Sequence, residues 1–263
     1  LWEAIESAKA STGGALCCHY AVIDKAGRAA LNNHGVGLSR SDLIVFVSND
    51  FIFNPGCLSA HICFHRGHGG REAVGIGPAL FSDDFRHRSP FMRWIEDSGN
   101  LFGYSFSRDD PAMFPDNFFG VYNTSINKDF LLSAGGFDED FTFAAWEDLE
   151  CGKRLEADGM QVHLIQEAEA IHDHDLSFSE RAMAVYRAGK SVAGYQQKTG
   201  SNLATSSPMW RFVLESFYRQ LAVREGLKET FWSLALKASF LGGYLQAAGV
   251  HLIRKPLLLV GHR

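Results

Sequence analysis

Two adjacent carboxylates, Glu147 and Asp148, follow a glycine turn and open a segment with helical spacing. Adjacent carboxylates can divide two tasks at a reacting hydroxyl, one binding the hydroxyl and the other accepting its proton. Acidic residues are also favoured at helix N-termini by the macrodipole, so the spacing alone leaves a structural role open. The chemistry of the pair depends on which other side chains the fold brings close to it. One candidate is His172, which follows later in the chain.

Residues 42–48 form an apolar run, and Asp50 lies in the polar turn that follows it. The length of the run predicts a strand buried on both faces of a parallel sheet. Open α/β sheets bind ligands at the carboxyl ends of their strands. A carboxylate there can hold a divalent cation that neutralises a diphosphate. A turn-capping role for Asp50 is the alternative interpretation.

The segment His172-Asp173-His174 adds imidazoles to the candidate ligands. Alternate residues of an extended segment face the same way, so both histidines could face one site. A polar loop after a strand is the alternative.

A second group of metal-ligand residue types lies in a predicted helix over 57–66. On a helix, Cys57, His61 and His65 would share a face, with Cys63 and His68 nearby in sequence. The spacing matches no common zinc signature, so polar and thiol packing is favoured over a zinc-binding interaction module. Five cysteines without a C-x-x-C pair indicate reduced thiols rather than a disulfide framework.

The composition is that of a globular protein, with 263 residues, 46% of them hydrophobic and 21% charged. A net charge of −5 argues against a non-specific nucleic-acid surface, so no nucleic-acid partner is expected. The chain opens on an amphipathic helical pattern without a secretory signal. We therefore expect a cytoplasmic protein, at the inner face of a membrane if its tail binds lipid, whose chain begins inside a larger protein.

Predicted strands and helices alternate over 1–178 and give way to helices over 179–263, so we expect an α/β domain followed by a helical C-terminal extension. Residues 82–120 have weak periodicity and are predicted to be substrate-facing loops with short elements. The predicted strands are 15–23, 42–48, 73–81, 121–127, 161–165 and 168–172, and the predicted helices are 1–10, 27–38, 57–66, 128–134, 146–157, 180–190, 209–225 and 228–250.

The C-terminal tail includes a largely apolar stretch, Phe231–Ile253, that approaches the length of a membrane-spanning helix. Lys237 and the Gly242-Gly243 pair weaken that interpretation. We expect the tail to pack on the body or to form a homodimer. Peripheral membrane contact is the alternative, and it would suit a lipid-linked acceptor.

Taken in order, these pieces resemble the family-2 type of glycosyltransferase with the GT-A fold. The resemblance covers about residues 1–175, and the stretch from Gly135 to Asp148 also looks like the C-terminal part of galactosyltransferase-type enzymes. The residues that carry it are Asn33-His34-Gly35, the run from Asp42 to Asp50, Pro55, Leu58, Asn123 to Ile126, Gly135 to Glu139, Glu147-Asp148, Arg154-Leu155, Gly159 and His172.

The resemblance implies a reaction. The fold would be a GT-A-like mixed sheet flanked by helices, and the activity would be transfer of a sugar from a nucleotide diphosphate-sugar to a glycan or a lipid-linked saccharide. Asp148 matches the general base of inverting members. Glu147 and Trp146 match acceptor-binding positions.

The resemblance also implies a donor site that uses Mn²⁺ or Mg²⁺. Asn33, Asn49 and Asp50 would contact the donor and its diphosphate, and Asp50 and His172 would hold the cation. Ser48 stands where the family's D-x-D motif has its first aspartate. We also expect, from the resemblance, that the strands that bind the nucleotide base are missing from the front of this chain. The alternative is therefore a catalytically degenerate GT-A-fold protein that acts as a carbohydrate-binding or scaffold module.

Overall fold

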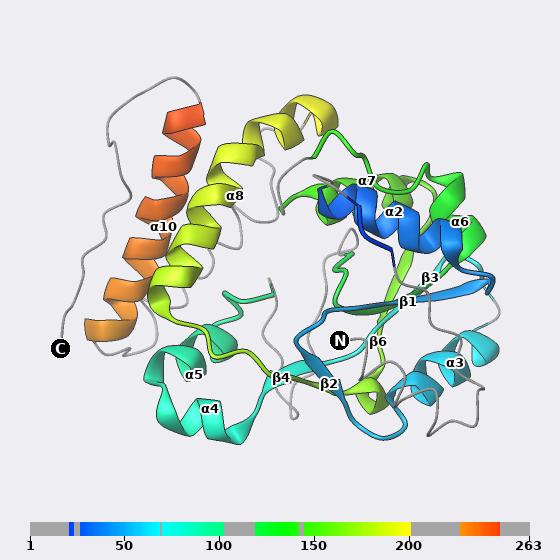
Figure 1. The fold of residues 1–263 in the computed structure, drawn as a ribbon, viewed down its shortest axis with the longest axis horizontal. Coiled ribbons are helices and arrows are strands. Elements are labelled where there is room, and N and C mark those ends of the chain that lie inside the picture. The colour runs from blue at the N-terminus through cyan, green and yellow to red at the C-terminus, as the bar shows by residue number, and fades with distance from the viewer. Residues whose placement is uncertain are drawn as a thin grey trace.

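The computed structural model describes residues 21–23, 27–68, 70–102, 119–141, 145–200 and 227–247 (Figure 1). The predicted helices 1–10 and 209–225 and most of the predicted strand 15–23 lie outside the described residues. The expectation that the first strands of the fold are missing also concerns a part of the chain outside the described residues.

The larger sheet has four strands in the order β1-β5-β3-β6. Strand β5 runs antiparallel to both β1 and β3, and β3 runs parallel to β6. The four strands are β1 (Leu43–Val47), β3 (Ala73–Ile76), β5 (Asn123–Asn127) and β6 (Gln161–Leu164). The prediction that the 42–48 strand is buried on both faces of a parallel sheet was wrong. β1 is antiparallel to its neighbour, and it buries Ile44 and Phe46 while Val47 is exposed.

The smaller sheet has three strands in the order β2-β7-β4. They are β2 (Phe51–Phe53), β4 (Ala79–Phe81) and β7 (Ala170–His172). The single strand predicted over 73–81 is divided at Gly77-Pro78, which sends β3 into one sheet and β4 into the other. A Cβ on Gly77 would lie 2.2 Å from Ala168 O, so only glycine fits where the chain passes between the sheets.

Helices flank the larger sheet on both faces. The four that were predicted, over 27–38, 57–66, 128–134 and 146–157, begin and end within about a residue of the expected bounds, whereas two short helices lie in the region 82–120 that was predicted to be mainly loops. Buried side chains of α2, α6 and α7 share one core with β1, β3 and β5, whereas Phe64 of α3 approaches Gly75 from the opposite face. Figure 1 shows α3 on the side of the sheet away from α2, α6 and α7. The helices of this body are α2 (Arg28–Leu38), α3 (Cys57–Gly67), α4 (Asp83–Arg88), α5 (Pro90–Asp97), α6 (Lys128–Ser133) and α7 (Glu147–Ala157), with a 3-10 turn at Gln166–Ala168.

Two long helices, α8 (Phe178–Thr199) and α10 (Leu227–Ala247), lie side by side at the C-terminal end (Figure 1). A capping box of Ser177 and Glu180 begins α8. Helix α10 also packs on the body, because Trp232 contacts the rings of Phe91 and Trp94 at centroid distances of 5.4 and 5.6 Å. Among the described residues, no helix has the length and apolar character needed to cross a membrane. The expected α/β architecture, a mixed sheet flanked by helices with a helical C-terminal region, is confirmed.

The α8–α10 pair depends on two glycines that let the backbones touch. A Cβ on Gly243 would lie 2.0 Å from Tyr186 O, and a Cβ on Gly189 would lie 2.1 Å from Phe240 O. We expect Gly243→Ala to separate the helices and to lower the free energy of unfolding by about 1–3 kcal/mol, the usual effect of overpacking. Urea unfolding of the purified variant measures this loss.

The matched control is Gly194→Ala, in the same helix pair but with open space around the added methyl group. There the better helix propensity of alanine should raise stability by up to about 1 kcal/mol. Equal effects of the two substitutions would contradict the close packing at Gly243.

Candidate functional site

The edge where β2 meets β7 brings Asp50 beside two histidines. Phe51 of β2 pairs with His172 of β7, and Asp173 N donates to Asp50 O at 2.8 Å. The antiparallel pairing therefore continues one residue beyond β2. It fixes Asp50 next to the end of β7, which is the arrangement predicted for Asp50 and His172.

The three side chains meet at one carboxylate oxygen. Asp50 Oδ2 lies 3.2 Å from His172 Nε2 and 3.2 Å from His174 Nδ1, and one ligand atom from each residue falls within 4.8 Å of the others. Asp50 Oδ1 is buried and accepts no hydrogen bond from the described part of the chain. A carboxylate and two imidazoles with an unused buried oxygen are a donor set that a divalent metal ion can satisfy.

His172 is held rigidly by aromatic rings. Its ring lies between those of Phe51 and Phe81, at centroid distances of 5.1 and 5.0 Å, and Phe102 contacts it at 5.4 Å. This burial lowers the pKa of His172, although the nearby charge of Asp50 opposes the shift. His172 is therefore neutral at pH 7, which is the form that binds metals.

Asp50 remains ionised at any physiological pH. Burial raises its pKa, but the polar side chains of Ser48 and His174 and the proximity of His172 outweigh burial and lower the pKa of Asp50 to about 2. Ser48, two residues ahead of Asp50 in the chain, thus supports the negative charge of Asp50.

The acid pair begins α7 directly after a strained residue. Trp146 has a φ of 79°, a left-handed conformation that is rare for a bulky side chain and costs about 1–3 kcal/mol. Tertiary contacts hold it there, because its Nε1 donates to Ala188 O of α8 at 2.8 Å and its ring lies 5.0 Å from that of Tyr195. Helix α8 therefore sets the position of the residues that follow Trp146.

Both carboxylates of the acid pair have pKa values above their ordinary ones. Glu147 is 1% exposed, accepts from Ala145 N at 2.9 Å and has Arg28 Nε 3.8 Å from its second oxygen. Burial raises the pKa of Glu147, with Arg28 opposing the shift. Burial and then the charge of Glu147 raise the pKa of Asp148 to about 7. Asp148 can therefore exchange a proton near neutral pH.

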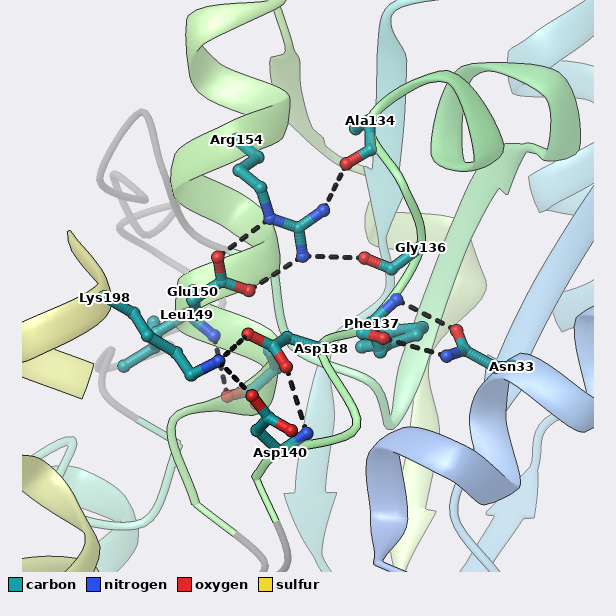
Figure 2. A network of polar contacts seen from close by, with 11 residues as sticks. Asn33, Ala134, Gly136, Phe137, Asp138, Asp140, Leu149, Glu150, Arg154 and Lys198 are labelled. Carbon is teal, nitrogen blue, oxygen red and sulfur yellow. Dashed lines mark hydrogen bonds and ion pairs between the residues drawn. The ribbon is translucent and has the colours of Figure 1, made fainter. Parts of the chain in front are cut away.

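The loop ahead of the acid pair is fixed by α2 and α7 (Figure 2). The Asn33 amide accepts from Phe137 N at 2.9 Å and donates to Phe137 O at 2.8 Å and to Glu139 Oε1 at 2.9 Å. Arg154 donates to Gly136 O at 2.7 Å and to Ala134 O. The glycine turn is thus a rigid structure rather than an open loop.

Helix α8 fixes the same loop from a third side. Lys198 Nζ donates to both Asp138 and Asp140, at 2.8 Å in the second case (Figure 2). Asp138 and Asp140 are therefore paired with Lys198 and are not free carboxylates for a ligand.

The structure places the other predicted site residues as follows. Asn49 is exposed on the turn before Asp50, the Asn33 amide is engaged by the loop, and Trp146 is buried against α8. Their predicted donor and acceptor contacts stay predictions. Within the described residues the acid pair makes no contact with the Asp50 cluster. Helix α8 connects the two, since it begins shortly after His174 and meets Trp146 at Ala188.

Three basic residues at the site were not predicted. The spacing of Glu150 and Arg154 is a usual helical ion pair and could have been noticed, and the pair forms at 2.7 Å. No local signal links Arg28 to Glu147 or Lys198 to Asp138, because these partners are distant in sequence. His174 was expected to face the same site as His172 without being assigned as a ligand, and it contacts Asp50.

Cys57 and His61 of α3 serve the core, where their polar atoms are engaged by neighbouring residues. His61 Nδ1 lies 2.8 Å from Ser125 Oγ and its Nε2 lies 3.0 Å from Asn123 Oδ1, so both ring nitrogens are engaged. Cys57 Sγ donates to Ala168 O at 3.3 Å, and Cys63 is exposed. In the described part of the chain, only Asp50, His172 and His174 form a group of metal-ligand atoms, so the zinc-module alternative has no ligand set there.

Comparisons with known proteins find similarity of shape among solved structures. No protein-family model matches the sequence, and no curated protein matches it. Among solved structures, the chain is similar to a crystal structure of GalNAc-T7 with UDP, GalNAc and Mn²⁺, with a TM-score of 0.48 and 9% sequence identity. The match covers 84% of this chain and 47% of the other, so the chain spans about half the length of that protein.

Proposed function

We propose that this protein is a metal-dependent glycosyltransferase that moves a sugar from a nucleotide diphosphate-sugar to the hydroxyl of a glycan or lipid-linked acceptor, with inversion. The observation that carries the proposal is the contact of Asp50 with His172 and His174 at one sheet edge. A rigid, ionised carboxylate beside a neutral, buried imidazole is a combination that structural packing alone does not require.

The residues present fit a divalent cation. Asp50 supplies an ionised oxygen, and His172 and His174 supply nitrogen, a mixed set that suits Mn²⁺ better than Mg²⁺, which prefers oxygen ligands alone. When bound, such an ion offsets the negative charge of a leaving diphosphate. Asn49, which is exposed on the same turn as Asp50, is proposed to contact the donor.

Asp148 is proposed to be the general base. As the acceptor oxygen forms its bond to the anomeric carbon, the hydroxyl proton passes to an Asp148 carboxylate oxygen. The bond from the anomeric carbon to the diphosphate breaks, and its electron pair leaves with the diphosphate. Asp148 then releases the proton to solvent. A pKa of about 7 makes both proton transfers feasible at neutral pH.

Glu147 is proposed to hold the acceptor through its buried oxygen. Oε1 makes no hydrogen bond to any described residue, although Arg28 lies 3.8 Å away. An acceptor hydroxyl could donate to this oxygen and would then lie within reach of Asp148. A single displacement with one base inverts the configuration at the anomeric carbon.

A donor screen tests the proposal. The chain is incubated with Mn²⁺ and a panel of UDP-, GDP- and dTDP-linked sugars, with and without mixed saccharide acceptors, and released nucleoside diphosphate is measured. We expect release from at least one donor and its loss in EDTA. Saturable donor binding without release would favour the degenerate carbohydrate-binding alternative. Neither binding nor release with any donor would refute both.

A further inference from the structure

Arg181, in the first turns of α8, is a half-buried cation that has no counter-ion among the described residues. Its Nη2 donates to Asn100 O and, at 3.2 Å, to Leu101 O. Its Nε is buried and has no hydrogen-bond partner in the part of the chain that the structure describes. No carboxylate in the described part of the chain forms an ion pair with it. The nearest acid in sequence, Glu180, is engaged in the capping box with Ser177.

An uncompensated charge of this kind is unfavourable in the fold. Removing a cation from water costs several kcal/mol unless an opposite charge or several good hydrogen bonds replace the solvent. Two carbonyl oxygens satisfy only part of a guanidinium that has five N–H groups. Burial lowers the pKa of Arg181 to about 10, which leaves the side chain charged at neutral pH. The positive charge is therefore available to an anion that the described residues do not supply.

The position of Arg181 relates this charge to the metal-ligand cluster. The carbonyls that it contacts belong to the turn before Phe102, and the Phe102 ring lies 5.4 Å from that of His172. His174 lies just ahead of α8 in the chain. The turn at 100–102 thus contacts both Arg181, through its carbonyl groups, and His172, through the Phe102 ring.

We infer that Arg181 is an anion-binding residue of this site and that the group it takes is a diphosphate. A guanidinium pairs bidentately with phosphate oxygens, and its free N–H groups would be satisfied by such a ligand. The choice of a diphosphate rests on the proposed function. The presence of an anion-binding guanidinium rests on the contacts of Arg181 alone.

Binding of inorganic pyrophosphate tests the inference without a sugar or a metal. Isothermal titration of the full chain is carried out in EDTA with wild type, Arg181→Met and Arg181→Lys. We expect the methionine variant to bind about 10- to 100-fold more weakly, the range for losing one or two charge-assisted hydrogen bonds. The lysine variant should regain part of the affinity. The matched control is Arg187→Met, which removes an exposed charge from the same helix.

A second measurement uses the unaltered protein, in case Arg181→Met does not fold. Arginine modification by phenylglyoxal is mapped by peptide mass spectrometry, and pyrophosphate should slow modification of Arg181 but not of Arg187. Equal pyrophosphate affinity in wild type and a folded Arg181→Met, no affinity in wild type, or unprotected Arg181 would overturn the inference. Arg181-dependent pyrophosphate binding without turnover of any donor would overturn the proposed function and leave this inference standing.

Discussion

Asp148→Asn is expected to lower sugar-transfer turnover by about 10²–10⁴-fold, the usual contribution of a positioned base. Asparagine has nearly the same shape but cannot accept the acceptor proton, so the affinity for the nucleotide donor should stay close to that of wild type. Steady-state rates with saturating donor, together with donor affinity from titration, separate the two effects. Wild-type turnover in the variant would refute the assignment of Asp148 as the base.

The pH profile of the wild type provides an independent check of Asp148. With a pKa of about 7, Asp148 is almost fully ionised above pH 8. Below pH 7 the ionised fraction falls about tenfold per pH unit. Turnover should follow that fraction.

The stability of the fold should vary with pH in the opposite direction. The pKa of Asp148 is raised from the ordinary value of 3.8, so its contribution to stability is greatest below that value and is lost as pH rises toward 7. Asp148→Asn should remove this loss, and the variant should unfold at the same or a higher urea concentration than wild type at pH 8. A clearly lower midpoint would indicate that the ionised carboxylate stabilises the fold.

Asp50→Asn is expected to weaken Mn²⁺ binding by more than about 100-fold. Loss of a residue that only supports a metal ligand typically costs 10- to 100-fold, and Asp50 would be the one charged ligand of the cluster. The measurement is a titration of free Mn²⁺ by electron paramagnetic resonance.

The matched control for Asp50→Asn is Asp173→Asn. This substitution makes the same change of charge beside the histidines, at a residue that contacts Asp50 through its backbone N–H. It should leave Mn²⁺ affinity nearly unchanged. Equal losses in the two variants would show that only the local charge matters, and equal affinity of Asp50→Asn and wild type would exclude Asp50 as a ligand.

Local patterns in the sequence predicted most of the elements that surround the site. The apolar run ending at Val47 marks β1, and the glycines after Ser133 and at Gly159 end α6 and α7. The break at Gly77-Pro78 carried a signal that was not used, because proline has no N–H for a sheet ladder. Strand direction had no local signal, since β1 pairs with a strand about 80 residues later.

The sequence predicted which residues belong to the site, but it did not predict the contacts between them. Asp50 and His172 are 122 positions apart, so their contact depends on the pairing of β2 with β7. The raised pKa of Asp148 depends on burial and on Glu147, and burial is a property of the folded chain. The positive φ of Trp146 is the least predictable feature, because tryptophan rarely adopts it and only the contact with α8 explains it.

The most direct test of the central claim is whether nucleoside diphosphates bind through the Asp50 cluster. Isothermal titration of UDP, GDP and dTDP into wild type, Asp50→Asn and Asp148→Asn is carried out with Mn²⁺ and again with EDTA. We predict that one nucleotide binds wild type and Asp148→Asn equally with Mn²⁺, and binds far more weakly in EDTA or to Asp50→Asn. Binding that is indifferent to both Mn²⁺ and Asp50, or no binding of any of the three nucleotides, would contradict the account.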